Sequence, residues 1–285
     1  MSETVQSLRH KIEGATELGS VVRTMKALSA SGIAQYERAV ASLDEYYRAV
    51  ELGLIACLRS KEAGRVQRSG NLCAVVFGSD QGLAGQFNEV LADFVVARLE
   101  QETSEKHVLV IGERMQGYLE SYRMTRSFAV PNSIAAVSKA TGRILEALEA
   151  DGAGRVYVFH NRPQAGSAYE PVMQRLLPLD AAWQAGLARK HWPSGNLPEV
   201  IGEETLKALI REYLFISLFR ACAESLASEN AARLNAMQRA EKNIEELLEF
   251  LNQDFHHLRQ AGIDEELFDV IAGYELLAGK ATAIL

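Results

Sequence analysis

All six prolines of this 285-residue chain lie between positions 131 and 198. The first 130 residues contain none, and neither do the last 87. A proline inside a helix costs about 3 kcal/mol or more, so long helices exclude it. Both ends of the chain can therefore form long helices around an irregular middle. The absence of proline is weak evidence by itself, and the spacing of the apolar residues has to support it.

Apolar residues near the N-terminus recur at alternating steps of three and four, which is the spacing of a coiled-coil seam. The seam contains Ile33, Tyr36, Val40, Leu43, Tyr47, Val50, Leu54 and Cys57. Continued towards the N-terminus, its members become smaller or polar: Ser29, Lys26, Val22, Gly19, Ala15, Ile12 and Leu8. Small residues in a seam would let a partner helix approach closely.

A second seam with the same spacing runs through the last part of the chain. Its fifteen members are Leu209, Tyr213, Ile216, Arg220, Ala223, Ala227, Asn230, Leu234, Met237, Glu241, Ile244, Leu248, Leu251, Phe255 and Leu258. Twelve are apolar, and the exceptions are Arg220, Asn230 and Glu241. The pattern predicts helix from about 203 to 278, a rod of roughly 110 Å, against roughly 85 Å for residues 3–60.

Two such rods favour a two-stranded antiparallel coiled coil in which residues 1–60 pair with residues 203–285. Neither rod fits inside a globular domain of 31.4 kDa. Two separate helical bundles remain the alternative.

Short apolar runs alternate with helical patterns in the middle of the chain. The runs are 72–77, 107–111, 127–130 and 155–159, with a less regular fifth at 171–177. The helical patterns are 86–101, 113–121 and 133–150. Strands that are apolar on both faces, separated by helices, predict a mostly parallel sheet covered on both sides. We therefore expect a Rossmann-like α/β domain over 70–180, joined to the second rod by a connecting segment, 181–202.

The glycine-rich loop GSDQGLAGQFN at 78–88 resembles a phosphate-binding loop in composition only. No lysine follows Gly82 or Gly85, and the GxGxxG spacing is absent. We favour a tight turn at the end of a strand over a phosphate site, and we expect no cofactor.

Other catalytic and metal-binding patterns are equally weak. His256 and His257 are adjacent and would point about 100° apart on a helix, and the acidic cluster at 264–269 is typical of a solvated helix start. Neither Gly-x-Ser-x-Gly nor His-Glu-x-x-His occurs. We expect no catalytic residue and no metal site, although a metal at the acidic cluster remains an alternative.

Net charge, apolar run length and cysteine content limit the kinds of partner and cellular location that we expect. A formal net charge of −7 disfavours binding to bare nucleic acid. No apolar run reaches the ~18–20 residues that span a bilayer, and the N-terminus shows no secretory signal. The three scattered cysteines are typical of buried thiols in a reducing compartment.

Four stretches resemble the gamma subunit of rotary F-type ATP synthases. Residues 8–33 resemble the opening helix of that family, with Met25 at its Met, and the loop at 78–88 is similar to T-S-D-x-G-L-C-G-x-F/Y-N. ESLASENAARLNAMQRAEKN at 224–243 resembles E-x-x-A-S-E-x-x-A-R-M-x-A-M-x-x-A-x-x-N, and 258–273 is similar to A-R-Q-A-x-I-T-x-E-L-x-E-I-V-x-G. The resemblance covers both ends of the chain and one middle loop.

This resemblance implies a non-catalytic central-stalk rotor that couples ion flow to conformational change at catalytic sites. The implied partners are the catalytic beta and non-catalytic alpha head subunits, the epsilon subunit and the membrane c-ring, with no nucleic acid and no direct small-molecule substrate. It implies a peripheral location on the cytoplasmic side of a bacterial inner membrane. The implied head contacts are Met25, Arg233, Arg259 and Gln260, and the implied membrane-ring contact is Glu199.

The sequence departs from the family in several places, including residues 16–19, 24–28 and 274–285. Residues 1–60 hold seven basic and seven acidic residues, where the family carries more lysine and arginine. The tract 196–200 keeps Glu199 but lacks the tyrosines of the family's Tyr-x-Tyr-Glu-Pro. These departures indicate a divergent branch, such as an alternate ion-translocating ATPase. A nucleotide-dependent α/β enzyme with helical appendages and a coiled-coil scaffold unrelated to ATP remain the alternatives.

Overall fold

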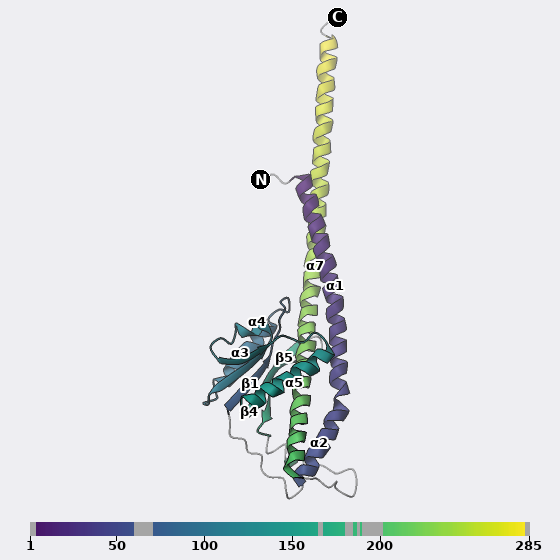
Figure 1. The fold of residues 1–285 in the computed structure, drawn as a ribbon. Coiled ribbons are helices and arrows are strands. Elements are labelled where there is room, and N and C mark those ends of the chain that lie inside the picture. Colours follow the sequence, from purple (N-terminus) through teal and green to yellow (C-terminus); the bar gives the residue numbers. More distant parts are fainter. Residues whose placement is uncertain are drawn as a thin grey trace. The chain divides into compact units, whose positions relative to one another are not determined.

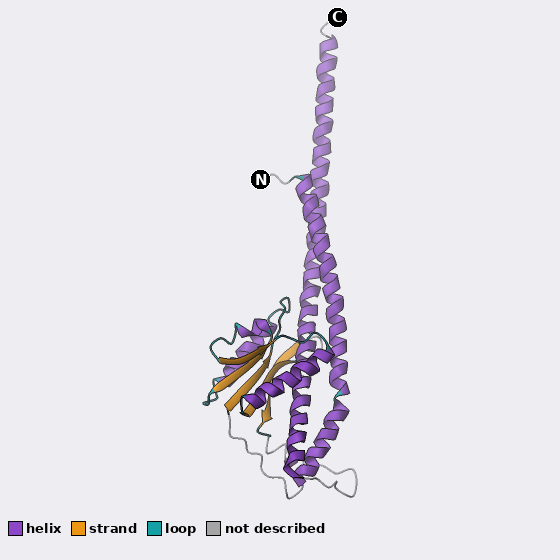
Figure 2. Cartoon of the chain, viewed as in Figure 1, coloured by secondary structure: helices purple, strands orange, loops and turns teal. Residues whose placement is uncertain are grey.

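A computed structural model describes residues 4–59, 71–164, 168–179, 185–186, 189 and 202–282. Long helices stand at both ends of the described chain, and five strands alternate with shorter helices between them (Figures 1 and 2). In chain order the elements are α1 (Val5–Ser42), α2 (Asp44–Arg59), β1 (Asn71–Phe77), α3 (Phe87–Leu99), β2 (Lys106–Ile111), α4 (Glu113–Gln116), β3 (Arg123–Phe128), α5 (Ile134–Ala150), β4 (Ala153–Gln164), β5 (Ala168–Leu177) and α7 (Gly202–Thr282).

The chain divides into two compact units. One contains residues 28–236, and the other contains residues 1–27 and 237–285. Within the described residues, no helix has an apolar stretch long enough to cross a membrane.

In the larger unit, the five strands form one sheet in the order β3-β2-β1-β4-β5. The first four are parallel, and β5 pairs with β4 in the antiparallel direction. The predicted α/β fold with a mostly parallel sheet is confirmed.

Each face of the sheet has its own core, because successive side chains of a strand point to opposite faces. Cys73, Val75 and Phe77 of β1 belong to the core shared with α2, α5 and α7. Leu72, Ala74 and Val76 belong to the core under α3 and α4. This two-sided burial explains why the central strands read as unbroken apolar runs.

The predictions were inaccurate at one edge of the sheet. The third strand was expected at 127–130, but β3 spans Arg123–Phe128. It is an edge strand with polar residues at Arg123, Thr125 and Arg126, so it lacks the apolar run that marks a central strand. The helix expected at 113–121 is reduced to the four residues of α4, followed by turns.

Within the larger unit, the N-terminal helices run antiparallel to α7. Gly53 of α2 lies against Leu209, whereas Gly32 of α1 lies against Asn230. The rings of Tyr47 and Tyr213 are in contact at a tilt of 47°, with centroids 6.3 Å apart. The first helix was expected to be continuous to about residue 60, but α1 ends at Ser42 and α2 begins at Asp44. The two acidic residues that open α2 favour a new helix start at that point.

In the smaller unit, the first part of α1 lies along α7. Leu8, Ala15, Met237 and Leu251 are buried. A Cβ added to Gly19 would meet the Ile244 side chain at 3.5 Å, an ordinary packing distance. Every member of both predicted seams is buried or partly buried, so the predicted helix faces are confirmed.

The three polar residues in the α7 seam each meet a specific partner. Arg220 forms an ion pair with Asp44 and lies over the Tyr47 ring, 5.7 Å from its centroid. Asn230 occupies the space beside Gly32, where a Cβ would lie 2.9 Å from its Oδ1. In the smaller unit, Glu241 forms an ion pair with Lys26, the charged member of the α1 seam. The interruptions thus fix which residues of the antiparallel helices stand opposite each other.

Candidate interaction surface on the terminal helices

The α7 helix carries a long stretch whose side chains touch little else in the chain. Every residue from Arg259 to Ala272 is exposed. Large apolar side chains stand among them: Ile263, Leu267, Phe268, Val270 and Ile271. Phe268 and Val270 are each 69% exposed.

Such a stretch is suited to packing against a partner, because most helical stability in proteins comes from packing of an apolar face. Contiguous exposed apolar surface usually marks an interaction site. We define the exposed tip as residues 259–272 and treat it as the centre of the candidate surface.

Arg259 and Gln260 lie at the start of the exposed tip. Both side chains are exposed, whereas the preceding Leu258 is partly buried. The two residues therefore present one cation and one amide to the surroundings without an internal role among the described contacts. This placement suits hydrogen bonding to a partner's carbonyl or carboxylate groups.

Met25 belongs to a second apolar stripe on α1 that the sequence analysis missed. Leu18 and Val21 are 61% and 55% exposed, and Met25 is partly buried. The steps of three and four continue along the same helix to Leu28, which is 67% exposed. The spacing itself was visible in the sequence, but the stronger buried seam concealed it. The stripe is therefore an exposed apolar face of α1 beside the buried seam.

Arg233 differs from the other predicted head contacts because it is buried. It is 8% exposed and forms an ion pair with Glu229, one turn earlier on α7. Burial raises the pKa of Glu229, with Arg233 opposing and Asp80 adding to the rise. A polar cavity of about 190 Å³ beside the pair is lined by Tyr36, Asp80, Asn132 and neighbouring residues. One guanidinium nitrogen of Arg233 is paired with Glu229, whereas its buried Nε has no hydrogen-bond partner among the described residues.

Glu199, the predicted membrane-ring contact, lies outside the described residues. So does the rest of its tract, 196–200.

The polar residues of the glycine-rich loop bind backbone groups of the larger unit. Asp80 accepts hydrogen bonds from the backbone N–H of Glu113 at 2.7 Å and of Val130 at 2.8 Å. Asn88 accepts from the Ser79 N–H at 3.0 Å and donates to its hydroxyl at 2.8 Å. These bonds join the ends of three strands, which gives the motif's Ser, Asp and Asn a structural role that supports the turn interpretation.

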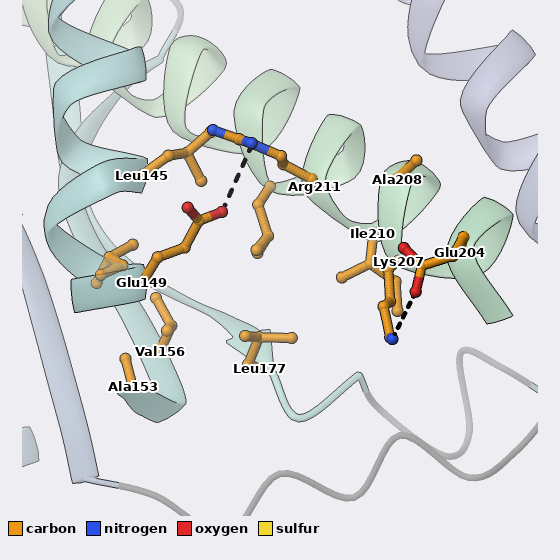
Figure 3. Close-up of a pocket in the computed structure, with 12 residues that line it drawn as sticks. Leu145, Glu149, Ala153, Val156, Leu177, Glu204, Lys207, Ala208, Ile210 and Arg211 are labelled. Carbon is orange, nitrogen blue, oxygen red and sulfur yellow. Dashed lines mark hydrogen bonds and ion pairs between the residues drawn. The ribbon is translucent and has the colours of Figure 1, made fainter. Parts of the chain in front are cut away.

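A larger cavity of about 330 Å³ lies between α5, the sheet and the start of α7 (Figure 3). Its lining includes Leu145, Leu148, Val156, Leu177, Ile210 and Leu214. Two ion pairs stand at its rim: Glu149 with Arg211 at 3.5 Å, and Glu204 with Lys207 at 2.9 Å. This arrangement suits packing against an apolar group rather than catalysis.

The acidic cluster and the adjacent histidines do not converge. Asp264, Glu265, Glu266 and Asp269 are all exposed, as are His256 and His257. Within the described part of the chain, no three His, Cys, Asp or Glu side chains are grouped to hold a metal ion.

Known proteins are similar to this chain over almost its whole length. The sequence profile of the family described as ATP synthase matches residues 4–277. The ATP synthase gamma chain of Anaeromyxobacter sp. (strain Fw109-5) is 28% identical, with 96% of this chain and 99% of the relative covered. The ATP synthase gamma chain of Aquifex aeolicus (strain VF5) is 26% identical, with 96% and 98% covered.

Two solved assemblies contain chains of the same fold. A chain of the Euglena gracilis mitochondrial ATP synthase, from its OSCP/F1/c-ring in rotational state 3, gives a TM-score of 0.70 at 18% identity, with 97% of this chain and 95% of that chain covered. A chain of the Tetrahymena thermophila mitochondrial ATP synthase central stalk and c-ring gives 0.56 at 19% identity, covering 77% and 99%.

Proposed function

The chain belongs to the ATP synthase gamma-chain family, whose members are central-stalk rotor subunits of F-type ATP synthases, and from that premise we propose how its own residues do this work. The chain is non-catalytic. Its exposed tip enters a ring of catalytic beta and non-catalytic alpha subunits. The sheet with α3, α4 and α5, here called the α/β unit, stays outside that ring, beside the epsilon subunit and the membrane c-ring, on the cytoplasmic side of a bacterial inner membrane.

The observation that carries this proposal is the exposed tip of α7. A helix of fourteen consecutive exposed residues with five large apolar side chains is suited to being enclosed by a partner. A surrounding ring encloses such a helix from every side, whereas a partner on one side would leave much of its apolar surface in water.

The mechanism follows from a mismatch of symmetry. A ring of three catalytic and three non-catalytic subunits is pseudo-symmetric, but a pair of antiparallel helices is not. Each catalytic interface therefore meets a different face of the helix pair. Faces that bind the open and closed states with different affinity shift the conformation of each site. Rotation carries these preferences from one catalytic site to the next. Ion flow through the membrane ring therefore drives ATP synthesis, and ATP hydrolysis turns the helix pair in the opposite direction.

Individual residues take separate roles in the proposal. Arg259 and Gln260 hydrogen-bond a catalytic-subunit loop at the base of the tip, and the stripe of Leu18, Val21 and Met25 makes apolar contact with the head. Arg233, with its guanidinium paired to Glu229, acts chiefly by holding α7 in shape. Glu199 contacts the membrane ring.

Reconstitution with purified alpha and beta subunits tests the proposal. The full chain should assemble with them and support steady-state ATPase, whereas the chain alone should show neither ATP hydrolysis nor micromolar ATP binding. A matched chain ending at Leu258 should fold but give less ATPase when assembled. Hydrolysis by the isolated chain would favour the nucleotide-enzyme alternative, and failure to bind either subunit would favour the unrelated scaffold.

A further inference from the structure

The strongest sequence motif of the chain contains three polar side chains that leave α7 and bind the sheet. Ser225 donates from its hydroxyl to the carbonyl of Phe77, the last residue of β1, at 3.0 Å. Ser228 donates to the carbonyl of Asn161 in β4 at 2.9 Å. Glu224 lies with its Oε2 2.8 Å from Nε2 of His160, also in β4. All of these groups belong to the larger unit.

The contacts are protected from water on the strand side. His160 and Asn161 are at most 1% exposed, and Ser225 and Ser228 are at most 3% exposed. Asn161 also donates from its side chain to the carbonyl of Phe87 at 3.0 Å, which connects the same point to the start of α3. Water cannot readily replace bonds in such a site, so breaking one leaves a buried polar group unsatisfied.

The buried neighbours of the two serines on this helix face are apolar. Leu218, Ala221 and Ala232 are buried and follow the same steps of three and four as Ser225 and Ser228. Apolar contact is non-directional, so such neighbours resist separation better than they resist rotation or sliding. Hydrogen bonds, by contrast, weaken steeply when distance or angle changes. The directional contacts of Glu224, Ser225 and Ser228 therefore oppose turning of α7 on the sheet. Arg162 of β4, whose Nε lies 3.3 Å from Oε2 of Glu224, and the hydrogen bond between Tyr213 and Gln174 of β5 act in the same sense.

We propose that Glu224, Ser225 and Ser228 form a torque-transmitting junction that locks the rotation of α7 to the α/β unit. This inference rests on the proposed rotor function and deepens it, because torque that enters through the α/β unit must pass into α7 to reach the head. It also gives the polar residues of ESLASE at 224–229 a mechanical role inside the chain rather than a contact with the head.

A single-molecule measurement places this junction under load. The complex is built with cysteine-free alpha and beta subunits, the head is fixed to a surface, and a bead is attached through Asp93→Cys on the exposed face of α3. The three native cysteines are buried, so the new thiol reacts selectively. During each pause in ATP-driven rotation, the variance of the bead angle reports the stiffness between the gripped helix and the α/β unit.

The variant S225A/S228A should widen the angular variance roughly twofold or more, because two buried hydrogen bonds between α7 and the sheet are lost. ATPase without the bead should stay near the wild-type rate. S217A is the matched control, since it removes a buried serine hydroxyl of the same helix that bonds Tyr213 within α7 and leaves the hydrogen bond between Tyr213 and Gln174 of β5 in place. It should leave the variance unchanged. If the double variant does not assemble, S225A and S228A tested singly should each give a smaller increase.

The proposed junction would be overturned if S225A/S228A showed the same angular variance as the wild-type chain. If the double variant does not assemble, wild-type variance in both single variants would overturn it. So would equal widening in S217A, because the effect would then reflect general loosening of the helix. A wild-type complex whose bead does not rotate would instead contradict the proposed rotor function, so the two failures are distinguishable.

Discussion

His160 is a buried titratable residue whose environment favours the neutral ring. Burial lowers its pKa below the ordinary value of 6.5, and the hydrogen-bonded Glu224 opposes that change without overcoming it; Arg162 adds slightly to the lowering. Burial alone would raise the pKa of Glu224, but His160 and Arg162 outweigh it and leave the pKa lowered. The neutral His160 therefore donates its Nε2–H to the Glu224 carboxylate.

We expect a pH dependence of stability that comes from this ring. Below pH 6.5 the unfolded chain binds a proton at position 160 that the folded chain resists, so the free energy of unfolding falls as pH falls. One such group contributes at most about 1.4 kcal/mol per pH unit. Glu224 adds its own loss only at lower pH, near its ordinary value of 4.5 and below.

Urea unfolding at pH 7.5 and pH 5.5 measures the contribution. His160→Gln keeps an N–H donor for Glu224 but does not titrate, so it should lose less stability between these pH values than the wild-type chain. An equal loss in both proteins would show that another group causes the dependence.

Arg259 and Gln260 carry the sharpest prediction about the proposed head contact. Replacing both with Ala should change the stability of the free chain by less than about 0.5 kcal/mol, because both side chains are exposed. In the assembled complex the loss of charged hydrogen bonds that become desolvated should cost about 1.5–3 kcal/mol. Assembly and steady-state ATPase are the measurements.

A matched control stands on the same helix. Gln238 and Arg239 are also exposed, and Q238A/R239A removes the same two chemical groups. Wild-type assembly and ATPase in R259A/Q260A would show that Arg259 and Gln260 are ordinary surface residues. Equal defects in both double variants would show the same.

At the scale of elements, the polar residues of the seams fix how the antiparallel helices align. Lys26 and Glu241 are partly buried, with side-chain exposures of 37% and 18%. Reversing one charge places like charges together in the seam, and reversing both restores an attractive pair. In a double-mutant cycle of K26E and E241K, we expect a coupling of about 0.5–1 kcal/mol in the urea unfolding free energy.

The ion pair between Arg9 and Glu13 is the control for this cycle. It is well exposed, with side-chain exposures of 75% and 61%, and it lies within α1. The same reversal of both charges there should show clearly weaker coupling than the seam pair. Additive effects of K26E and E241K would mean that the pair does not set the alignment.

Two glycines of α1 should respond differently to alanine. Nothing lies within 4 Å of a Cβ added to Gly14, so G14A should stabilise the chain by about 0.5–1 kcal/mol through helix propensity. At Gly32 the new Cβ would lie 2.9 Å from Oδ1 of Asn230, whose amide nitrogen already donates to the Leu226 carbonyl. G32A should therefore show no gain. Thermal unfolding compares the two, and a gain of equal size in G32A would mean that the Asn230 side chain moves aside without cost.

At the scale of the whole molecule, the sequence predicted what depends on local periodicity. Both seams and the central strands follow from residue spacing alone, because burial of a helix face or a strand repeats along the chain. The edge strand β3 could not be located by an apolar run, since Arg123 and Arg126 face water. Partnerships between distant residues, such as Ser225 with Phe77, leave no periodic signal. Contacts with other subunits stay predictions, and Glu199 lies outside the described residues.

The antiparallel pairing of α1 with α7 has a consequence for the order of events during synthesis. The ribosome completes α2 at residue 59 but begins α7 only at residue 202. At ordinary elongation rates that interval lasts on the order of ten seconds, far longer than helix formation. The N-terminal helices must wait through it without their partner. The small and polar seam positions of α1, including Gly19, Lys26 and Ser29, limit the apolar surface that a nascent chain exposes to aggregation during that delay.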